Sequence, residues 1–173
     1  SVNGESVNYS NDGKQLIIYN KFKPSKDNKL DFIFFASPKK AMYFVGWDNE
    51  ARNQIWTQGQ GKFTSHWLPS IDDMNDKIEF DLTFAAPKDF EVISNGRLIA
   101  KLESSTYNLW KYDMEKPMSS YLAALVVGKY SKKVKTSKSG IPLEMYYYPE
   151  DSLKVEPTYR YAKEMFDFLE EEI

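Results

Sequence analysis

The sequence predicts an all-β domain, an antiparallel sheet or sandwich, with one α-helix at its C-terminal end. Short runs of aromatic and β-branched residues recur with Asn-Gly, Asp-Gly and Ser-Gly turn signals between them, which is typical of antiparallel strands. Aromatic residues make up 16% of the chain, and they favour strands. The last stretch alone has helical spacing, with one apolar stripe over Ala162, Met165, Phe166, Leu169 and Ile173.

The first strands are expected around two tight turns, Asn3-Gly4 and Asn11-Asp12-Gly13. Asn, Asp and Gly tolerate the positive φ that such turns require. Two strongly apolar strands are expected next, LDFIFFAS over 30–37 and AMYFVGW over 41–47. A polar loop over Asp48–Asn53 should follow them.

The middle of the chain predicts two strands, Gln54–Gln58 and Ile78–Ala85, in which aromatic and branched residues nearly alternate with polar ones. The clearest hairpin signal comes after them. Phe90–Ile93 leads into the turn Ser94-Asn95-Gly96, and Arg97–Leu102 follows. We therefore expect these two runs to pair with each other.

Further strands are predicted at Tyr107–Tyr112 and Tyr121–Val127, linked by Met114–Ser120. Another hairpin should join Lys129–Thr136 to Pro142–Tyr148. These short strands complete the prediction of an all-β fold.

The C-terminal helix should begin at about Pro157, because a proline at the first helical position lacks an N–H that would be unpaired there in any case. Tyr159, Tyr161 and Phe168 widen its apolar surface beyond one stripe. We therefore expect the helix to pack on residues that this sequence does not contain.

Composition excludes several classes of function. The net charge is −2, and the most basic run, Lys129 to Lys138, alternates with apolar residues like a solvated strand face, which argues against a nucleic-acid partner. Without cysteine there is no disulfide or thiol catalysis, although this leaves the compartment open. No run of about 18 apolar residues exists, so no membrane span is expected. The chain lacks an initial Met and its helical pattern reaches Ile173, which favours a piece of a longer protein.

The long connection between the two middle strands is the first place to look for function. It has neither helical nor strand period, and connections of this length are usually functional or disordered. Its large apolar residues must be buried somewhere, which argues for order: Phe63, Trp67, Leu68 and Ile71. The connection would then present Gln58, Gln60 and Asp72.

Gln58 and Gln60 are the strongest candidates for binding. Gly59 and Gly61 let the backbone bend closely around a partner, and residues two apart on an extended chain point to the same side. Each amide offers a carbonyl acceptor and two N–H donors. The pattern leaves two readings at equal weight, amides that pair with the neighbouring loop backbone and amides that bind a sugar or a peptide.

The other polar residues of this connection give weaker signals. His66 is the one histidine, so a His-rich metal site or a Ser-His-Asp triad has at most one member here. Asp72, Asp73 and Asp76 lack the spacing and the glycine of a calcium loop, so turn capping or surface pairing is favoured.

Several motifs, taken in order, resemble the amino-terminal domain of M1 zinc aminopeptidases, the family of aminopeptidase N and leukotriene A4 hydrolase. The matching runs cover nearly the whole chain: Trp56-Thr57-Gln58-Gly59-Gln60, Trp67-Leu68-Pro69-Ser70-Ile71-Asp72-Asp73, Asn75-Asp76-Lys77, Val92-Ile93-Ser94-Asn95-Gly96 and Lys116-Pro117-Met118-Ser119-Ser120-Tyr121-Leu122. The ordered series is more specific than any one of its members.

The resemblance implies a saddle-shaped antiparallel β domain over residues 1–150 that covers a thermolysin-like catalytic domain. Residues 151–173 would begin that catalytic domain. The family motifs H-E-x-x-H and G-x-M-E-N are absent, so no catalytic or metal-binding residue is assigned here, and the fragment itself should be neither zinc-binding nor an enzyme. The full-length parent should hold zinc and remove amino-terminal residues from peptides, with the catalytic domain and a peptide's free amino terminus as partners.

The resemblance also gives roles to the two glutamines. Gln60 matches a family position that binds the free α-amino group of the substrate, and Gln58 matches one that lines the pocket for the first side chain. Two positions depart from the family pattern, Ser65 in place of Arg and Met74 in place of Pro. The alternative is a free-standing β-sandwich module that binds carbohydrate or protein, which the aromatic content alone would support. An H-E-x-x-H motif beyond Ile173 would discriminate between the two.

Overall fold

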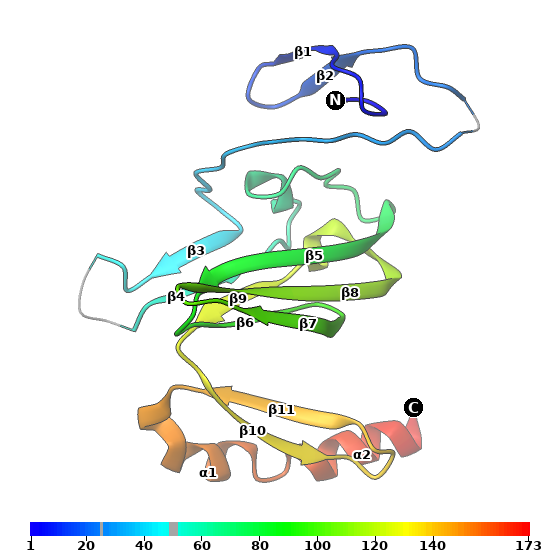
Figure 1. The fold of residues 1–173 in the computed structure, drawn as a ribbon. Helices are drawn as coiled ribbons and strands as arrows, with labels where there is room; N and C mark the ends of the chain where they lie inside the picture. Colours follow the sequence, from blue (N-terminus) through cyan, green and yellow to red (C-terminus); the bar gives the residue numbers. More distant parts are fainter. Residues whose placement is uncertain (25, 49–51) are drawn as a thin grey trace. The chain divides into compact units, whose positions relative to one another are not determined.

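The computed structural model describes residues 1–24, 26–48 and 52–173 (Figure 1). Two compact units form, Ser1–Ala36 and Ser37–Ile173. Half of the polar loop predicted over Asp48–Asn53 lies outside the described residues, since 49–51 are not among them.

The first unit contains a hairpin of β1 (Asn8–Asn11) and β2 (Leu16–Tyr19), as predicted. Asp12 Oδ1 accepts hydrogen bonds from the backbone N–H groups of Lys14 (2.8 Å) and Gln15 (2.7 Å), which closes the turn. The Asn3-Gly4 turn also forms, with φ values of 52° and 85°.

The strand predicted over 30–37 is wrong. Leu30 makes one isolated bridge with Val2, and no strand is present in the described residues from 31 to 38. Ile33 and Phe35 are 96% and 98% exposed. A strand needs a neighbour whose backbone completes the hydrogen-bond ladder. Apolar composition predicts where a strand would gain from burial, but it does not supply that neighbour.

The second unit is built mainly from antiparallel strands, which confirms the all-β prediction (Figure 1). One sheet has the order β3-β4-β9-β6, with β3 at Met42–Val45, β4 at Gln54–Thr57, β6 at Glu91–Ser94 and β9 at Leu125–Gly128. Another has the order β5-β8-β7, with β5 at Lys77–Pro87, β7 at Arg97–Glu103 and β8 at Tyr107–Ser119. A separate hairpin joins β10 (Ser131–Thr136) to β11 (Pro142–Tyr147).

The two larger sheets share one core, as in a sandwich. Val92 and Val127 from one sheet lie in the same buried cluster as Trp110 and Tyr112 from the other. Trp110 is 1% exposed, and aromatic side chains of this size dominate the free energy gained by burial. Tyr112 Oη donates a hydrogen bond to the Val92 carbonyl oxygen (2.7 Å), which joins the two sheets directly.

The hairpin predicted across Ser94-Asn95-Gly96 is also wrong, although the turn itself is present. β6 pairs with β9, whereas β7 pairs with β8, so the chain changes sheets at this corner. A Cβ on Gly96 would lie 2.2 Å from the Asp113 carbonyl oxygen, and φ is +82°, so glycine is required. Asn95 Oδ1 accepts from the Ala124 N–H (2.5 Å), which attaches the corner to the start of β9. The pattern predicts the turn but not the partner of either strand.

The predicted link Met114–Ser120 does not form, because Met114–Ser119 continue β8 as part of a 13-residue strand and Ser120 begins a 3-10 helix, Ser120–Leu122. Lys77 and Ile78 pair with Ser119 and Met118. Pro117 falls within the irregular part of this ladder, where a residue without an N–H is tolerated.

The helical end is present, but it starts earlier than predicted and is interrupted. A 3-10 helix over Pro149–Lys154 leads into α1 (Val155–Tyr159), and α2 (Ala162–Glu172) follows. Pro157 lies in the first turn of α1, where it costs no hydrogen bond. Lys135 Nζ, from β10, donates to the carbonyl oxygens of Tyr159 and Arg160 (3.4 and 3.1 Å) and so satisfies the end of α1.

Helix α2 lies beside the β10–β11 turn (Figure 1), and polar contacts attach it there. Asp167 is 6% exposed, and its carboxylate accepts hydrogen bonds from the Lys138 backbone N–H (2.8 Å) and from Lys163 Nζ (2.5 Å). These bonds, that of Lys163 first, lower the pKa of Asp167. Ser139 Oγ donates to Glu170 (2.7 Å).

Candidate functional site

The connection from β4 to β5 turns sharply at the two glutamines. The Gln58 N–H donates to the Ala41 carbonyl oxygen (2.8 Å), which extends the β3–β4 ladder by one residue. The Gly59 carbonyl oxygen then accepts from the Phe63 N–H (3.2 Å). Lys62 has a positive φ of 70°, and the chain enters a 3-10 helix at Thr64. Gln58 and Gln60 therefore lie at the end of a paired strand and not in a loose loop.

Gly59 is buried between two exposed glutamines. A Cβ at this position would lie 2.5 Å from Thr64 Oγ1 and 2.7 Å from the Tyr121 carbonyl oxygen. The close approach explains why glycine stands here, since any side chain would separate the turn from the segment at Tyr121. The Gly59 backbone therefore packs closely against Thr64 and Tyr121, while both glutamine side chains remain exposed.

Hydroxyl groups fix the rest of this connection. Thr64 is fully buried, and its Oγ1 donates to the Ser120 carbonyl oxygen (3.1 Å). Ser120 Oγ donates to the Ile71 carbonyl oxygen (2.9 Å), and Ser119 Oγ donates to that of Met74 (2.6 Å). The motif that contains Ser119 and Ser120 is evident in the sequence, but its place against this connection is not. The presence of both runs in one series of motifs was the available signal.

Apolar packing confirms that the connection is ordered. Trp67 is 8% exposed and belongs to a buried cluster with Ala41 and Phe80, against which Phe63 and Leu68 pack. Ile71 is different, because its side chain is 67% exposed. The expectation that Ile71 would be buried is wrong, since its carbonyl oxygen and not its side chain holds the chain at this point.

The acidic residues of the connection close turns, as predicted. The Asp72 carboxylate accepts from the Ser65 N–H (3.2 Å) and from Ser65 Oγ (2.5 Å), next to the 3-10 helix. Asp73 Oδ1 accepts from the Asn75 N–H (2.8 Å). Ser65, which stands where the resembled family has Arg, therefore supports the turn through a hydroxyl group.

The two glutamine amides bind each other. Gln58 Nε2 donates to Gln60 Oε1 at 3.2 Å. This contact differs from the first reading, in which each amide pairs with loop backbone. A carbonyl oxygen has two lone pairs, so Gln60 Oε1 can accept a second hydrogen bond while Gln58 holds its orientation. The pair can therefore bind an N–H donor such as an ammonium group.

Aromatic and basic side chains stand beside this turn. The His66 ring meets the Phe63 ring edge-on, with their centroids 5.8 Å apart. Lys40 Nζ lies 4.4 Å from the centroid of the same Phe63 ring. His66 thus packs against the Phe63 ring from the last position of the 3-10 helix Thr64–His66. Within residues 1–24, 26–48 and 52–173, no group of three or more His, Cys, Asp or Glu side chains could hold a metal ion.

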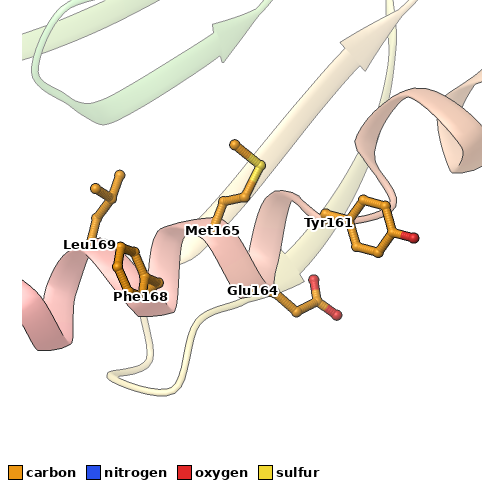
Figure 2. Close-up of a pocket in the computed structure, with 5 residues that line it drawn as sticks. All are labelled: Tyr161, Glu164, Met165, Phe168 and Leu169. Carbon is orange, nitrogen blue, oxygen red and sulfur yellow. The ribbon is translucent and has the colours of Figure 1, made fainter.

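A shallow apolar hollow of about 430 Å³ lies elsewhere, on α2 (Figure 2). Its lining comes from one turn-and-helix segment: Tyr161, Glu164, Met165, Phe168 and Leu169. Figure 2 shows these side chains projecting from the helix. This surface can make apolar contacts, but its one ionisable acid, Glu164, has no catalytic partner within the lining. The amide pair is the better candidate for chemistry.

Comparisons with known proteins agree with the motifs. The family model described as the peptidase M1 N-terminal domain matches residues 2–122. A glutamyl aminopeptidase of Homo sapiens is 32% identical over 147 residues, which cover 75% of this chain and 15% of that protein. A glutamyl aminopeptidase of Sus scrofa is 29% identical over 107 residues, which cover 60% of this chain and 11% of that protein.

The fold has a solved counterpart. The crystal structure of an M1 zinc metallopeptidase from Deinococcus radiodurans superposes with a TM-score of 0.70 and 17% identity, covering 86% of this chain and 36% of that one. The chain thus spans a small part of each of these proteins. In the part of the chain that the structure describes, no helix has the length and apolar character needed to cross a membrane.

Proposed function

This chain belongs to the peptidase M1 N-terminal domain family, and from that premise we propose that it is the substrate-anchoring domain of a zinc aminopeptidase. In this proposal the domain covers the active site of a catalytic domain in the same parent chain. It binds the free amino terminus of a peptide there, and the parent removes the amino-terminal residue.

The observation that carries the proposal is the exposed pair Gln58 and Gln60 on a rigid turn. Buried Gly59 fixes the backbone between them, and Gln58 Nε2 orients the Gln60 carbonyl oxygen. A preorganised acceptor loses little entropy when a ligand binds. Gln60 Oε1 would accept an N–H of the substrate ammonium group, and Gln58 would border the space for the first side chain.

A neutral acceptor is sufficient for this role. A hydrogen bond with one charged partner contributes about 1.5–3 kcal/mol, and its loss would leave the ammonium group under-satisfied. The bond would also fix the distance from the amino terminus to the peptide bond that is cleaved. A peptide with a blocked amino terminus lacks the charged donor and would be selected against.

Zinc belongs to the parent in this proposal. A catalytic zinc site takes three protein ligands, and the described residues provide no such group. These residues therefore do not fit the metal.

The test uses the zinc-loaded full-length parent and one aminoacyl reporter substrate. Gln60→Ala should lower kcat/KM by roughly tenfold to a hundredfold, and Gln60→Glu should be tolerated or improve the affinity for free amino termini. Gln15→Ala, at an exposed glutamine of the β1–β2 turn, is the matched control and should change nothing. An amino-acetylated substrate should be poor for every version. A Gln60→Ala protein within twofold of wild type would refute the anchoring role.

Family membership favours this function over a free-standing module that binds carbohydrate or protein. The remaining check is the coding sequence beyond Ile173. An H-E-x-x-H motif there supports the peptidase, and an unrelated domain supports the module.

A further inference from the structure

A second polar cluster stands at the opposite end of β4 from the two glutamines. Arg52 precedes β4 by two residues. Its Nε lies 2.7 Å from Glu150 Oε1, and its Nη1 lies 2.5 Å from Asp151 Oδ2. Its guanidinium carbon is 4.5 Å from the centre of the Tyr148 ring. One side chain thus binds residues almost a hundred positions later by two ion pairs and one cation–π contact.

The partners of Arg52 are themselves held in place. Asp151 also binds Lys154 Nζ (2.7 Å), and its side chain is 21% exposed. Lys154 and Arg52, in that order, lower the pKa of Asp151. Tyr130 Oη donates to Gln54 Oε1 (3.2 Å), so a second residue near the start of β4 contacts the same region. The Tyr130 and Tyr148 rings have their centroids 5.1 Å apart.

This arrangement is more than an isolated surface ion pair, which would contribute about 0–1 kcal/mol. The guanidinium group is planar and always charged, so it can bind two carboxylates and lie on an aromatic ring at the same time. A lysine could not reproduce all three contacts. We therefore expect the cluster to fix the direction in which the chain continues after residue 151, and not merely to add stability.

The direction matters because β4 connects the cluster to the glutamines. β4 is paired on both sides, with β3 and β9, so it is not a free edge. Gln58 follows Arg52 by six residues, which is about 20 Å of extended chain. On the other side of the cluster, Pro149–Lys154 leads directly into α1 and α2. Arg52 thus lies where two segments meet: the start of β4, which leads to the glutamines, and Pro149–Lys154, which leads to the helices.

We propose that Arg52 is a positioning residue for the amino-terminus site, through its contacts with Glu150, Asp151 and Tyr148. It holds the chain beyond residue 151 in a fixed relation to Gln58 and Gln60. The inference rests on the proposed function, because a fixed relation matters only if the glutamines meet a substrate bound by the following part of the parent.

The test combines four versions of the full-length parent: Arg52→Ala, Arg52→Lys, Gln60→Ala and the double variant Arg52→Ala/Gln60→Ala. Arg52→Ala should lower kcat/KM for a free-amino reporter by roughly five- to fiftyfold, mainly through KM, because misplaced binding groups lose most of their effect. Arg52→Lys should recover part of this loss. The double variant should be within twofold of Gln60→Ala alone, because both changes remove the same contact.

Hydrogen exchange supplies a readout that does not depend on activity. Exchange over 149–155 should rise in Arg52→Ala, while exchange over 107–112 in β8 should stay unchanged, which separates a loosened cluster from a misfolded protein. Arg97→Ala is the matched control, since the Arg97–Glu115 pair is 74% and 73% exposed and should have no effect on either readout.

The outcomes are distinguishable. If the two single losses multiply in the double variant, Arg52 acts independently of Gln60 and this inference is overturned, while the proposed function stands. If exchange over 149–155 does not change, the inference is overturned as well. If Gln60→Ala itself has no effect, the proposed function fails, and the inference that rests on it fails too.

Discussion

The β4–β5 connection and helix α2 both carry large apolar side chains, but the connection buries Trp67 in a cluster whereas α2 leaves most of its apolar side chains open. Trp67 in the connection is 8% exposed, whereas Met165 and Phe168 on α2 are 65% and 60% exposed. The connection combines apolar packing with hydroxyl hydrogen bonds. The helix is attached through carboxylates such as Asp167.

The contrast shows that residues 1–24, 26–48 and 52–173 include those needed to stabilise the β4–β5 connection, but not those needed to cover the apolar face of α2. The connection has a buried cluster beneath it, so an irregular backbone is compatible with rigidity. The apolar face of α2 has no comparable cover among the residues that the structure describes. An exposed apolar surface of this kind marks an interface. In the proposed function, this face would pack on other residues of the parent's catalytic domain.

The strongest way to break the comparison is to shorten one aromatic side chain in each region. Trp67→Ala should lower the free energy of unfolding by about 3–5 kcal/mol, because it leaves a cavity in a buried cluster. Phe168→Ala, the matched change on α2, should stay within about 0.5 kcal/mol. Urea titration of the two variants of Ser1–Ile173 measures both values. Equal losses would show that the two faces are buried alike.

A smaller effect is expected at Gly59. Gly59→Ala should destabilise the chain by roughly 1–3 kcal/mol, because the new Cβ would overlap Thr64 Oγ1 and the Tyr121 carbonyl oxygen. Hydrogen exchange should rise over 59–68 and stay unchanged over α2. A variant with wild-type stability and wild-type exchange in this region would mean that close packing of Gly59 against Thr64 and Tyr121 does not hold the turn.

The hydroxyl contact of Thr64 sharpens the comparison further. Thr64→Val keeps the shape but removes the donor to Ser120, and the expected loss is about 1 kcal/mol, since the Ser120 carbonyl oxygen still accepts from the Ala123 N–H. Thr83→Val, at an exposed position of β5, is the control. Thermal unfolding should give a lower midpoint for Thr64→Val than for Thr83→Val. Coinciding curves would show that the hydroxyl hydrogen bond does not contribute to stability.

The smallest effect concerns pH and α2. The pKa of Asp167 is lower in the folded chain than in the unfolded chain, so the carboxylate stabilises the contact with Lys138 and Lys163 above about pH 3.9 and loses that effect as the pH falls through the folded-state pKa. Exchange protection of α2 should therefore fall more between pH 6 and pH 3 than protection of β8.

Asp167→Asn provides the control for this measurement. The asparagine amide does not titrate, so this variant removes the ionisable group at position 167 and leaves the hydrogen bonds of Glu170 and Glu171 to Ser139 and Lys138 in place. The additional loss at low pH should disappear in this variant. If it persists unchanged, Asp167 does not carry the pH dependence.

Much of the strand pattern could be predicted from the sequence, because alternation and turn residues are local signals. The hairpin β10–β11 and the turn at Asn11-Asp12-Gly13 formed as expected. The partners of β6 and β7 could not be predicted, because Ser94-Asn95-Gly96 satisfies a tight turn whether or not its flanking runs pair with each other. The prediction of a strand at 30–37 is wrong for a related reason, since a strand forms only where a neighbouring strand can pair with it.

The sequence singles out the two residues of the candidate site, whose binding role stays a prediction, but it does not reveal the contacts that support them. Gln58 and Gln60 stood out through their glycine neighbours, and both are exposed at the turn. Their mutual hydrogen bond depends on side-chain rotamers that no spacing rule fixes. The contact of Gly59 with Tyr121 joins positions about sixty residues apart, and the run at Arg52 carried no motif at all.

The sheet order β3-β4-β9-β6 has a consequence for how this protein is made. β9 occupies an inner position but is the last of the four strands to leave the ribosome. At about 5–20 residues per second, β4 waits roughly 3–14 s for β9 after its own synthesis. During that interval the β3–β4 hairpin and β6 expose edges that will later pair with β9. A nascent chain halted between β6 and β9 should therefore be the state that chaperones recognise.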